Sequence, residues 1–289
     1  MPTVLDTLQK GTDYLARHGV DEARLNMQQL LAHVLKCDRM ALYLDFDRGL
    51  DDTVLEKLRD FTRRRARGEP LQHLLGTVEF CGREFVCDHR ALVPRPETEE
   101  LAARLCKHPL PPRARILDMG AGSGVLGLTL AASLAERNHP ASVVLADLSE
   151  EALALAGENR ERLGLGAAAI ELAKSDLFEN VSGGSFDLIV ANLPYIPDGE
   201  ITALSREVRN DPEMALAGGE GGTELMERFL DAVPSRLNAG GTVAMEFGVG
   251  QGDVLRARAA AAGLEAIEIA RDLSGHERFL FAVKAAESA

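Results

Sequence analysis

Apolar side chains recur at helical spacing through residues 3–67. Four segments show the pattern, at Val4, Leu5, Leu8 and Leu15, at Leu25, Leu30, Leu31, Val34 and Leu35, at Met40, Leu42 and Leu44, and at Val54, Leu55, Leu58 and Phe61. Each stripe gives a helix one face to bury against a neighbour. Gly19 is expected to end the first helix, Asp21 to cap the second and Asp51 to begin the fourth. The pattern predicts a small helical bundle.

Beyond the helical segments the pattern changes twice. Residues 76–87 alternate apolar and polar positions around Cys81-Gly82, which predicts a β-hairpin. Farther along, short apolar runs alternate with amphipathic segments, which is typical of a mostly parallel sheet with helices on both faces. The predicted strands are 114–118, 142–147, 169–173, 186–191, 241–247, 265–270 and 278–284, and the predicted helices are 124–137, 150–163, 221–237 and 251–262. We therefore expect an α/β fold with a sheet of seven strands.

A proline-rich turn stands between the hairpin and the first strand of the sheet. Pro94 and Pro96 fix the backbone there, and the following residues favour a helix that runs to Cys106. Glu97 or Thr98 is placed to satisfy the first free amides of this helix. A rigid turn of this kind can also cover the charged end of a ligand, and the sequence leaves both roles open.

The length of 289 residues allows two domains. The predicted division is a helical domain at 1–70, a hairpin linker at 71–90 and an α/β domain at 91–289. No apolar run approaches the roughly 20 residues that span a bilayer, and the first residues lack the apolar block of a signal peptide, so we expect a cytoplasmic protein. The four cysteines show neither CxxC pairs nor His-linked spacing, which favours reduced thiols and no metal site.

The charge of the chain narrows the choice of partners. A formal net charge of -13 argues against direct nucleic-acid binding, which depends on Lys and Arg neutralising phosphates. A protein partner with a basic surface is easier to accommodate. The basic run from Arg63 to Arg67 is most simply a solvated helix end, with a binding role as the alternative.

The first predicted strand of the sheet leads into a glycine-rich loop, which lets the backbone approach a ligand closely. Gly122, Gly124 and Gly127 match the GxGxxG fingerprint of dinucleotide-binding proteins. The same loop matches the DxGxGxG pattern of S-adenosylmethionine methyltransferases, with Asp118 as the acid. The residues expected to bind a cofactor here are Asp118, Gly120, Ala121, Gly122, Ser123 and Gly124.

Acidic residues favour S-adenosylmethionine over NAD as the cofactor. Asp147 follows the second strand of the sheet and can bind ribose hydroxyls in either fold. Asp118 can hold the methionine ammonium, directly or through water, and a hydride-transfer enzyme has no such need. Asp176 follows the third strand, where it can accept from the adenine amino group, and Leu177 can cover the ring. We therefore expect S-adenosylmethionine as the methyl donor, with S-adenosylhomocysteine as its product.

The fourth predicted strand ends in Asn192-Leu193-Pro194-Tyr195. Pro194 stops the strand, and ligands of open parallel sheets bind at the carboxyl ends of their strands. A planar NH2 group can donate to the Asn192 side-chain oxygen and the Leu193 carbonyl, with Tyr195 over its face and the methyl donor beside Asn192. We predict that these four residues are catalytic. The alternative is a turn after a strand, in which Tyr195 only packs.

Together these motifs resemble the HemK/PrmC protein-(glutamine-N5) methyltransferases, which modify peptide chain release factors. The resemblance is carried by Arg67-Gly68-Glu69-Pro70, residues 76–86, 94–99 and 118–124, Asp147, Ser175-Asp176, residues 192–195, 215–219 and 246–248, Gln251 and residues 272–278. It implies a Rossmann-like class I methyltransferase domain that methylates the glutamine side-chain nitrogen of a Gly-Gly-Gln loop in release factors. Because that domain has a complete cofactor site, we expect the helical domain to dock the protein substrate.

Three positions depart from the family pattern. Leu193 stands where proline is usual, Asp211 where Glu is usual before proline, and Glu220 where Asp is common. The Leu193 carbonyl can keep its role, but Asn-Leu-Pro-Tyr also resembles the motif of rRNA adenine dimethyltransferases. The alternatives therefore include glutamine methylation of another protein such as a ribosomal protein, and N-methylation of an adenine or guanine amine in RNA or DNA. A binding module without activity is a further alternative.

Overall fold

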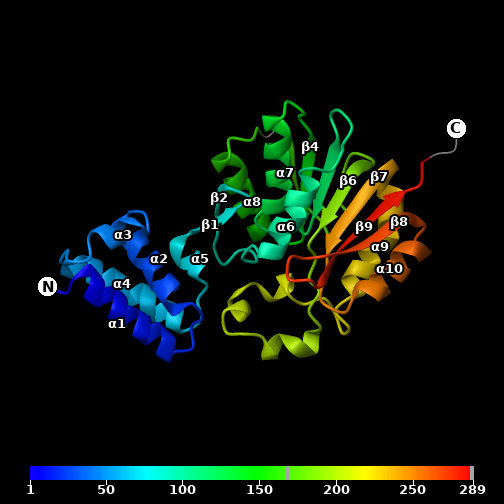
Figure 1. Ribbon diagram of the computed structural model, residues 1–289. Coiled ribbons are helices and arrows are strands. Elements are labelled where there is room, and N and C mark those ends of the chain that lie inside the picture. The colour runs from blue at the N-terminus through cyan, green and yellow to red at the C-terminus, as the bar shows by residue number, and fades with distance from the viewer. Residues whose placement is uncertain (167–168, 287–289) are drawn as a thin grey trace. The chain divides into compact units, whose positions relative to one another are not determined.

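The computed structural model describes residues 1–166 and 169–286. They fall into two units, one made of residues 1–77 and 204–210 and the other of residues 78–203 and those from 211 onward. The first unit is helical, and the second combines helices with a sheet (Figure 1). None of the described helices is long and apolar enough to cross a membrane.

The helical unit has a core of aliphatic side chains contributed by every one of its helices. These helices are α1 (Val4–Arg17), α2 (Ala23–Leu35), α3 (Ala41–Leu44), α4 (Asp52–Ala66) and α5 (Leu71–Leu75). Leu15, Leu30 and Leu58 are among the buried residues of the core. The four helices predicted from apolar spacing are confirmed, and α5 is an additional helix at the start of the predicted linker.

The helix caps agree with the sequence prediction only in part. Asp51 caps α4, because its side chain accepts a hydrogen bond from the Val54 amide at 2.9 Å. The cap predicted at Asp21 is wrong. The N-cap residue of α2 is Glu22, which has a left-handed φ of 49° and no capping side-chain bond. The Asn26 side chain instead donates to the carbonyl oxygens of Asp21 and Glu22, which holds the turn before the helix.

The basic run at the end of α4 is only partly solvated. Arg63 and Arg67 are exposed, as expected. Arg65 is buried, and its guanidinium donates to Asn26 Oδ1 at 2.7 Å and to Glu207 Oε2 at 2.5 Å. The prediction of a solvated end is therefore wrong for Arg65, which fixes the segment around Glu207 to the helical unit. A buried guanidinium needs such partners to offset its lost hydration.

The second unit contains a sheet of seven strands. They are β3 (Arg115–Met119), β4 (Ser142–Asp147), β5 (Ile170–Lys174), β6 (Phe186–Ala191), β7 (Leu237–Glu246), β8 (Leu264–Arg271) and β9 (Glu277–Lys284). Their order is β5-β4-β3-β6-β7-β9-β8, and the pairs among the first five are parallel. β9 runs antiparallel to β7 and to β8. The predicted α/β fold with seven mostly parallel strands is confirmed.

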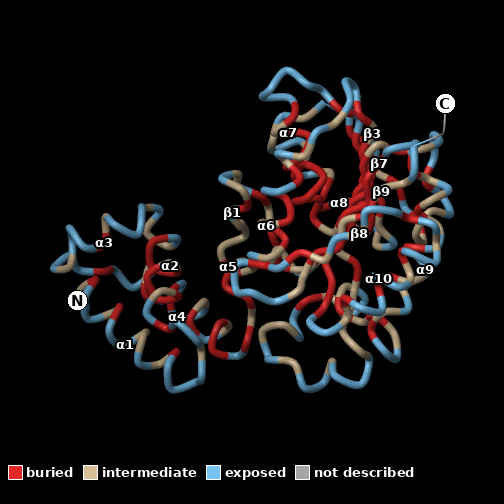
Figure 2. The backbone as a smooth tube through the Cα atoms, turned by 45° about the vertical axis from the view of Figure 1, so that its right-hand side comes forward, coloured by how far each residue is buried: buried red, intermediate tan, exposed pale blue. Residues whose placement is uncertain are grey.

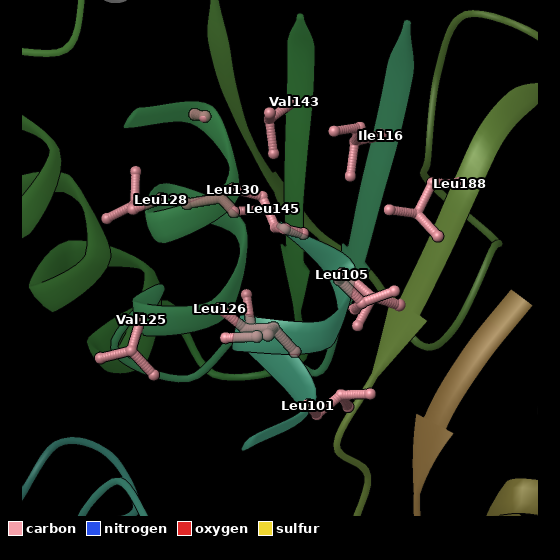
Figure 3. Packing of buried hydrophobic residues seen from close by; sticks show 14 of the residues in the cluster. Leu101, Leu105, Ile116, Val125, Leu126, Leu128, Leu130, Val143, Leu145 and Leu188 are labelled. Carbon is pink, nitrogen blue, oxygen red and sulfur yellow. The ribbon is translucent and has the colours of Figure 1, made fainter. Parts of the chain in front are cut away.

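Helices cover both faces of this sheet (Figure 1). They are α6 (Pro96–Leu105), α7 (Val125–Glu136), α8 (Glu150–Arg162), α9 (Glu224–Arg236) and α10 (Gly252–Ala261). The 3-10 turns η1 (Asp198–Ala203) and η3 (Glu213–Ala215) belong to the same unit, whereas η2 (Val208–Asn210) belongs to the helical unit. Ile116 and Leu145 belong to a buried cluster with residues of α6 and α7 (Figure 3). Leu117 and Val144 belong to a second cluster, with residues of α9 and α10. Because both faces are covered, β3, β4 and β6 are apolar at successive positions and buried over most of their length (Figure 2).

The predicted β-hairpin is confirmed as β1 (Thr77–Phe80) and β2 (Arg83–Val86). Cys81 and Gly82 form its two-residue turn with φ values of 49° and 71°. Positive φ at both central residues matches the right-handed twist of a hairpin. Phe80 and Phe85 are buried in the cluster under α6 and meet edge to face, with ring centroids 6.1 Å apart. The hairpin therefore contributes to the core of the second unit.

The strand order creates a switch point between β3 and β6. From β3 the chain moves outward to β4 and β5, and it then returns to place β6 on the other side of β3. Met119 and Ala191, the last residues of the two strands, are direct partners in the parallel register. The glycine loop after β3 and Asn192 after β6 consequently leave the sheet side by side. Crevices at such switch points are where open α/β sheets bind ligands.

Candidate active site

A cavity of about 180 Å³ is lined by the loops that follow β3, β4, β5 and β6, together with the proline-rich turn before α6 and residues of η3. The predicted site residues that line it are Asp118, Gly120, Ala121, Gly122, Ser123, Asp147, Asp176, Leu177, Asn192, Leu193 and Pro194. Gly124 and Tyr195 are not among the lining residues. Ala91, Leu92, Thr98, Pro212, Met214 and Leu225 line the cavity as well, although the sequence did not place them in a site.

The glycine loop is held against β4 by its own backbone. Gly120 and Gly122 have φ values of 72° and 55°, which bulkier residues rarely adopt. The amides of Gly120 and Ala121 both donate to the Ala146 carbonyl, at 2.8 and 3.0 Å. Gly124 is the N-cap residue of α7, so it shapes the turn into the helix behind the cavity. The loop thereby presents backbone and small side chains to the cavity.

Two carboxyl groups at this end of the sheet are held by backbone amides. Asp118 Oδ2 accepts from the Gly127 amide in the first turn of α7 at 2.8 Å, and burial raises the pKa of Asp118 to about 7. Asp147 accepts from the amides of Gly122 and Ser149, both at 2.8 Å. Burial raises the pKa of Asp147 above its ordinary value. Each carboxylate oxygen has two acceptor positions, so both groups retain capacity for a ligand.

The turn after β5 presents Asp176 and Leu177 to the cavity. The Ser175 hydroxyl donates to the Leu177 carbonyl at 2.6 Å and holds this turn closed. Leu177 has a φ of 45°, a strained conformation that in side-chain-bearing residues is concentrated at functional sites. The Asp176 carboxylate lies 3.3 Å from the guanidinium of Arg228.

The cavity carries more unpaired acid than base. Arg90 is ion-paired with Asp88 and Glu158, and Arg95 is ion-paired with Asp211 at 2.5 Å. Asp118 and Asp147 form no ion pair with any residue in the described ranges, 1–166 and 169–286. The electrostatic character of the cavity therefore suits a ligand with positive charge.

The Asn192 side chain lies at the end of a series of hydrogen bonds that links the carboxyl ends of the neighbouring strands β6 and β7 through α6. Its Nδ2 donates to Thr98 Oγ1 at 3.0 Å, and the Thr98 hydroxyl donates to Glu246 Oε2 at 2.7 Å. The Tyr195 hydroxyl is 3.4 Å from Glu246 Oε1. The Tyr195 ring is largely buried, and burial raises the pKa of its hydroxyl. The predicted capping role of Thr98 is wrong, because its hydroxyl is used in this series and α6 has no side-chain cap.

The proline-rich turn before α6 forms part of the cavity wall. Pro94 and Arg95 line the cavity, and α6 begins at Pro96. Asp211 anchors the turn by accepting from the Val93 amide at 3.1 Å and from Arg95. The turn thus starts a helix and borders the cavity at once, so the two roles that the sequence left open are compatible.

Along nearly its whole length the chain aligns with relatives that share one name. The release factor glutamine methyltransferase of Geobacter sulfurreducens is 39% identical, and the alignment covers 96% of this chain and 95% of that protein. The protein of the same name from Deinococcus radiodurans is 38% identical, with 97% and 98% covered. The chain belongs to the release factor glutamine methyltransferase family. The resemblance stated from its motifs is confirmed.

Two family models match separate parts of this member of the release factor glutamine methyltransferase family. The model of the PrmC N-terminal domain matches residues 6–76, and that of the methyltransferase small domain matches residues 97–220. Among solved structures, the 16S rRNA N2 G1207 methyltransferase of T. thermophilus, in complex with AdoMet and guanosine, has a TM-score of 0.50 and 21% identity. That alignment covers 72% of this chain and 49% of the other. It supports the methyltransferase fold and nothing finer.

Leu193, where this member departs from the family motif, lies against the glycine loop. Its side chain is buried, and a Cβ placed on Gly120 would come within 2.9 Å of Leu193 Cδ2. The leucine side chain therefore occupies the space that a side chain at position 120 would need. Within the described parts of the chain, no hydrogen bond uses the Leu193 carbonyl oxygen or Asn192 Oδ1. Two acceptors consequently remain available next to the cavity.

Proposed function

We propose that this chain transfers a methyl group from S-adenosylmethionine to the side-chain amide nitrogen of the glutamine in the Gly-Gly-Gln loop of peptide chain release factors. The observation that best supports this proposal is the pair of unused acceptors, Asn192 Oδ1 and the Leu193 carbonyl, beside a cavity that suits a cofactor. The amide NH2 group of glutamine has two hydrogens to offer such a pair. The names of the relatives point to the same substrate class.

The donor set of the cavity fits S-adenosylmethionine, which carries a sulfonium and an ammonium group. Asp118 would hold the ammonium, Asp147 the ribose hydroxyls, and Asp176 with Leu177 the adenine. The anionic pyrophosphate of NAD would face these carboxylates, and the cationic residues known to line the cavity, Arg90 and Arg95, are already ion-paired. When bound, S-adenosylmethionine supplies an electrophilic methyl carbon, whose bond to sulfur breaks as a bond to the attacking nitrogen forms, leaving S-adenosylhomocysteine and a proton.

The residues of the chain act by orientation and by electrostatics. A glutamine nitrogen is a poor nucleophile because its lone pair is delocalised into the carbonyl. Asn192 Oδ1 and the Leu193 carbonyl accept its two hydrogens, which raises electron density on nitrogen and fixes the direction of its lone pair. Positioning of this kind lowers a barrier by about 7–11 kcal/mol, whereas one polar contact contributes about 3 kcal/mol. Orientation is thus the larger of the two effects.

The competing substrates differ in what they demand of the surface. A base amine in RNA or DNA requires a basic track along the strand, and a chain with a net charge of -13 does not favour one. A glutamine in another protein, such as a ribosomal protein, would use the same chemistry. The preference for release factors over this alternative rests on the names of the relatives.

Mass spectrometry of a recombinant release factor, after incubation with this protein and S-adenosylmethionine, tests the proposal. We expect one added methyl group on the Gly-Gly-Gln glutamine and none on a factor in which that glutamine is replaced by glutamate. No addition by a preparation that binds S-adenosylmethionine would contradict the substrate assignment. Ribosomal proteins and RNA in the same assay would then show whether an alternative holds.

We also propose that residues 1–70 dock the protein substrate. Removing them should raise KM for whole release factor about tenfold or more, since a contact worth about 1.4 kcal/mol changes affinity tenfold. Turnover of a short Gly-Gly-Gln peptide serves as the control, because the peptide needs only the α/β unit. Equal losses with both substrates would contradict docking by the helical unit.

Cofactor affinity should depend on the protonation of Asp118. The free carboxyl has a pKa of about 7, and an ammonium beside it favours the ionised form, so affinity should fall as pH drops through 7. Asp118→Asn should weaken binding about tenfold or more at pH 8 and flatten the pH dependence. Calorimetric titration with S-adenosylmethionine between pH 6 and pH 8 measures both effects. An unchanged dissociation constant in the variant would remove Asp118 from the site.

A further inference from the structure

The carboxamide of Asn192 can present either its oxygen or its nitrogen to a substrate, and only the oxygen accepts a hydrogen bond. The proposed reaction needs the oxygen to face the cavity. Rotation of the amide by half a turn would aim two N–H donors at the glutamine NH2 group and repel it. The surrounding hydrogen bonds must therefore select one of the two orientations of the Asn192 amide, which have nearly the same shape.

The selection starts at Glu246, the last residue of β7. Its side chain is 1% exposed, and it bonds the Thr98 hydroxyl at 2.7 Å. An ionised carboxylate can only accept, so the single hydroxyl hydrogen of Thr98 is committed to Glu246. The Thr98 oxygen is then left as an acceptor toward Asn192, and only Nδ2 of the amide satisfies it, at 3.0 Å. Asn192 Oδ1 is thereby left for the cavity.

We infer that Thr98 and Glu246 are positioning residues that fix the orientation of the Asn192 carboxamide, so that its oxygen and not its nitrogen meets the substrate amide. The inference rests on the proposed function and adds two residues to its machinery. Thr98 also lines the cavity, whereas Glu246 reaches Asn192 through Thr98. Three elements cooperate, since Asn192 follows β6, Thr98 lies on α6 and Glu246 ends β7.

The direction of the hydrogen bonds that run between Glu246, Thr98 and Asn192 depends on the charge of Glu246. A protonated carboxyl can donate to Thr98, and the Thr98 hydroxyl is then free to donate to Asn192 Oδ1, which reverses the amide. The groups around the Glu246 carboxyl are Thr98 and Glu97 from α6, Tyr195, and Arg278 from β9. Burial raises the pKa of Glu246 to about 7, although Thr98 and Arg278 favour the ionised form. The active orientation is present above this pKa and is lost as pH falls through it.

Two substitutions separate this role from a merely structural one. Glu246→Gln keeps the shape but is neutral at every pH. The Tyr195 hydroxyl, which donates to Glu246 Oε1, favours the amide oxygen at that position and leaves the NH2 donor facing Thr98, so the variant should favour the reversed Asn192 amide at every pH. We expect kcat with a Gly-Gly-Gln peptide to fall about tenfold to a hundredfold, with the dissociation constant of S-adenosylmethionine unchanged. Thr98→Val should have a similar effect on kcat, and Thr98→Ser should restore most of it. Thr129→Val is the matched control, because Thr129 is a buried helical threonine whose hydroxyl finds no hydrogen-bond partner among the residues that the structure describes.

The pH profile supplies the readout that loss of packing does not change. At saturating cofactor, wild-type log kcat should fall below pH 7 with a one-proton slope, and Glu246→Gln should be slow and flat over the same range. Because the cofactor is saturating, a change in its affinity caused by protonation of Asp118 does not alter kcat. A wild-type acid limb that persists in Glu246→Gln, or an unchanged kcat, would overturn the inference while leaving the proposed function intact.

A measurement on the resting protein tests the inference even without turnover. The Asn192 side-chain NH2 signal, assigned by its absence in Asn192→Ala, should exchange slowly with solvent at pH 8 because Nδ2 is bonded to Thr98. Exchange should accelerate in Thr98→Val and stay slow in Thr129→Val. Fast exchange in the wild type would overturn the orientation inferred here. If the signal is protected but no glutamine is methylated, the proposed function fails and the fixed orientation stands.

Discussion

Replacing Asn192 with alanine is expected to lower kcat for glutamine methylation about a hundredfold or more, with the fold retained. The variant loses the Oδ1 acceptor and leaves the substrate NH2 group with the Leu193 carbonyl alone. Removal of one well-placed polar group from a preorganised site typically costs 100- to 1,000-fold in turnover, on the order of 3–4 kcal/mol. The lone pair of the amide nitrogen is also no longer held in one direction, which adds an orientational loss.

Stability should change much less than turnover in Asn192→Ala. Asn192 is half-buried, and its one described side-chain bond is the 3.0 Å contact to Thr98. Loss of such a bond costs about 0.5–1.5 kcal/mol. Asn238→Ala is the matched control, because Asn238 is exposed and its Nδ2 donates to Asp187 at 2.7 Å in a part of the sheet away from the cavity. Near-normal turnover in Asn192→Ala would remove Asn192 from the catalytic site.

The arrangement of the sheet and the neighbourhood of the cavity follow from local patterns in the sequence. Parallel strands buried on both faces appear as apolar runs, and each run ends at a residue of another character, such as Asp147 or Asn192. The parallel strands all end at one edge of the sheet. Residues that follow different apolar runs are therefore expected to lie close together, even when no contact between them is predicted. The loop glycines and Asp176 were placed by the same reasoning.

Contacts between distant segments were beyond this reasoning. Thr98 and Glu246 are 148 positions apart, and Arg65 and Glu207 are 142 apart. In the sequence, Thr98 looks like a cap at the start of a helix and Glu246 like the end of a strand. Their partnership depends on how α6 lies over the sheet, which no local spacing reports. The sequence offered two signals: Thr98 and Glu246 both lie in segments that carry the family resemblance, and Glu246 follows the apolar run 243–245, where an acid has to find partners to be buried.

Gly218→Ala is expected to reduce kcat about a hundredfold, although Gly218 itself does not line the cavity. Gly218 is buried beside the Asn-Leu-Pro-Tyr turn, and its amide donates to the Ile196 carbonyl at 2.9 Å. A Cβ added there would lie 2.8 Å from the Pro194 carbonyl oxygen, 2.8 Å from Tyr195 Cα and 2.7 Å from the Gly222 carbonyl oxygen. Carbon contacts are most favourable at about 3.5–4.0 Å, so all three are too close.

All three atoms are backbone atoms, so no side chain can rotate to make room and the turn itself must move. A shift of this turn displaces the Leu193 carbonyl relative to Asn192, and displacements near 1 Å can cost about a hundredfold in rate. Overpacking should also lower the free energy of unfolding by about 1–3 kcal/mol. Gly199→Ala is the control, because Gly199 is exposed and, apart from its chain neighbours, no described residue has an atom within 4 Å of the position of its added Cβ. Turnover measured well below the Tm of each variant separates the two effects, and a stable Gly218→Ala protein with normal kcat would show that the turn need not be held rigidly.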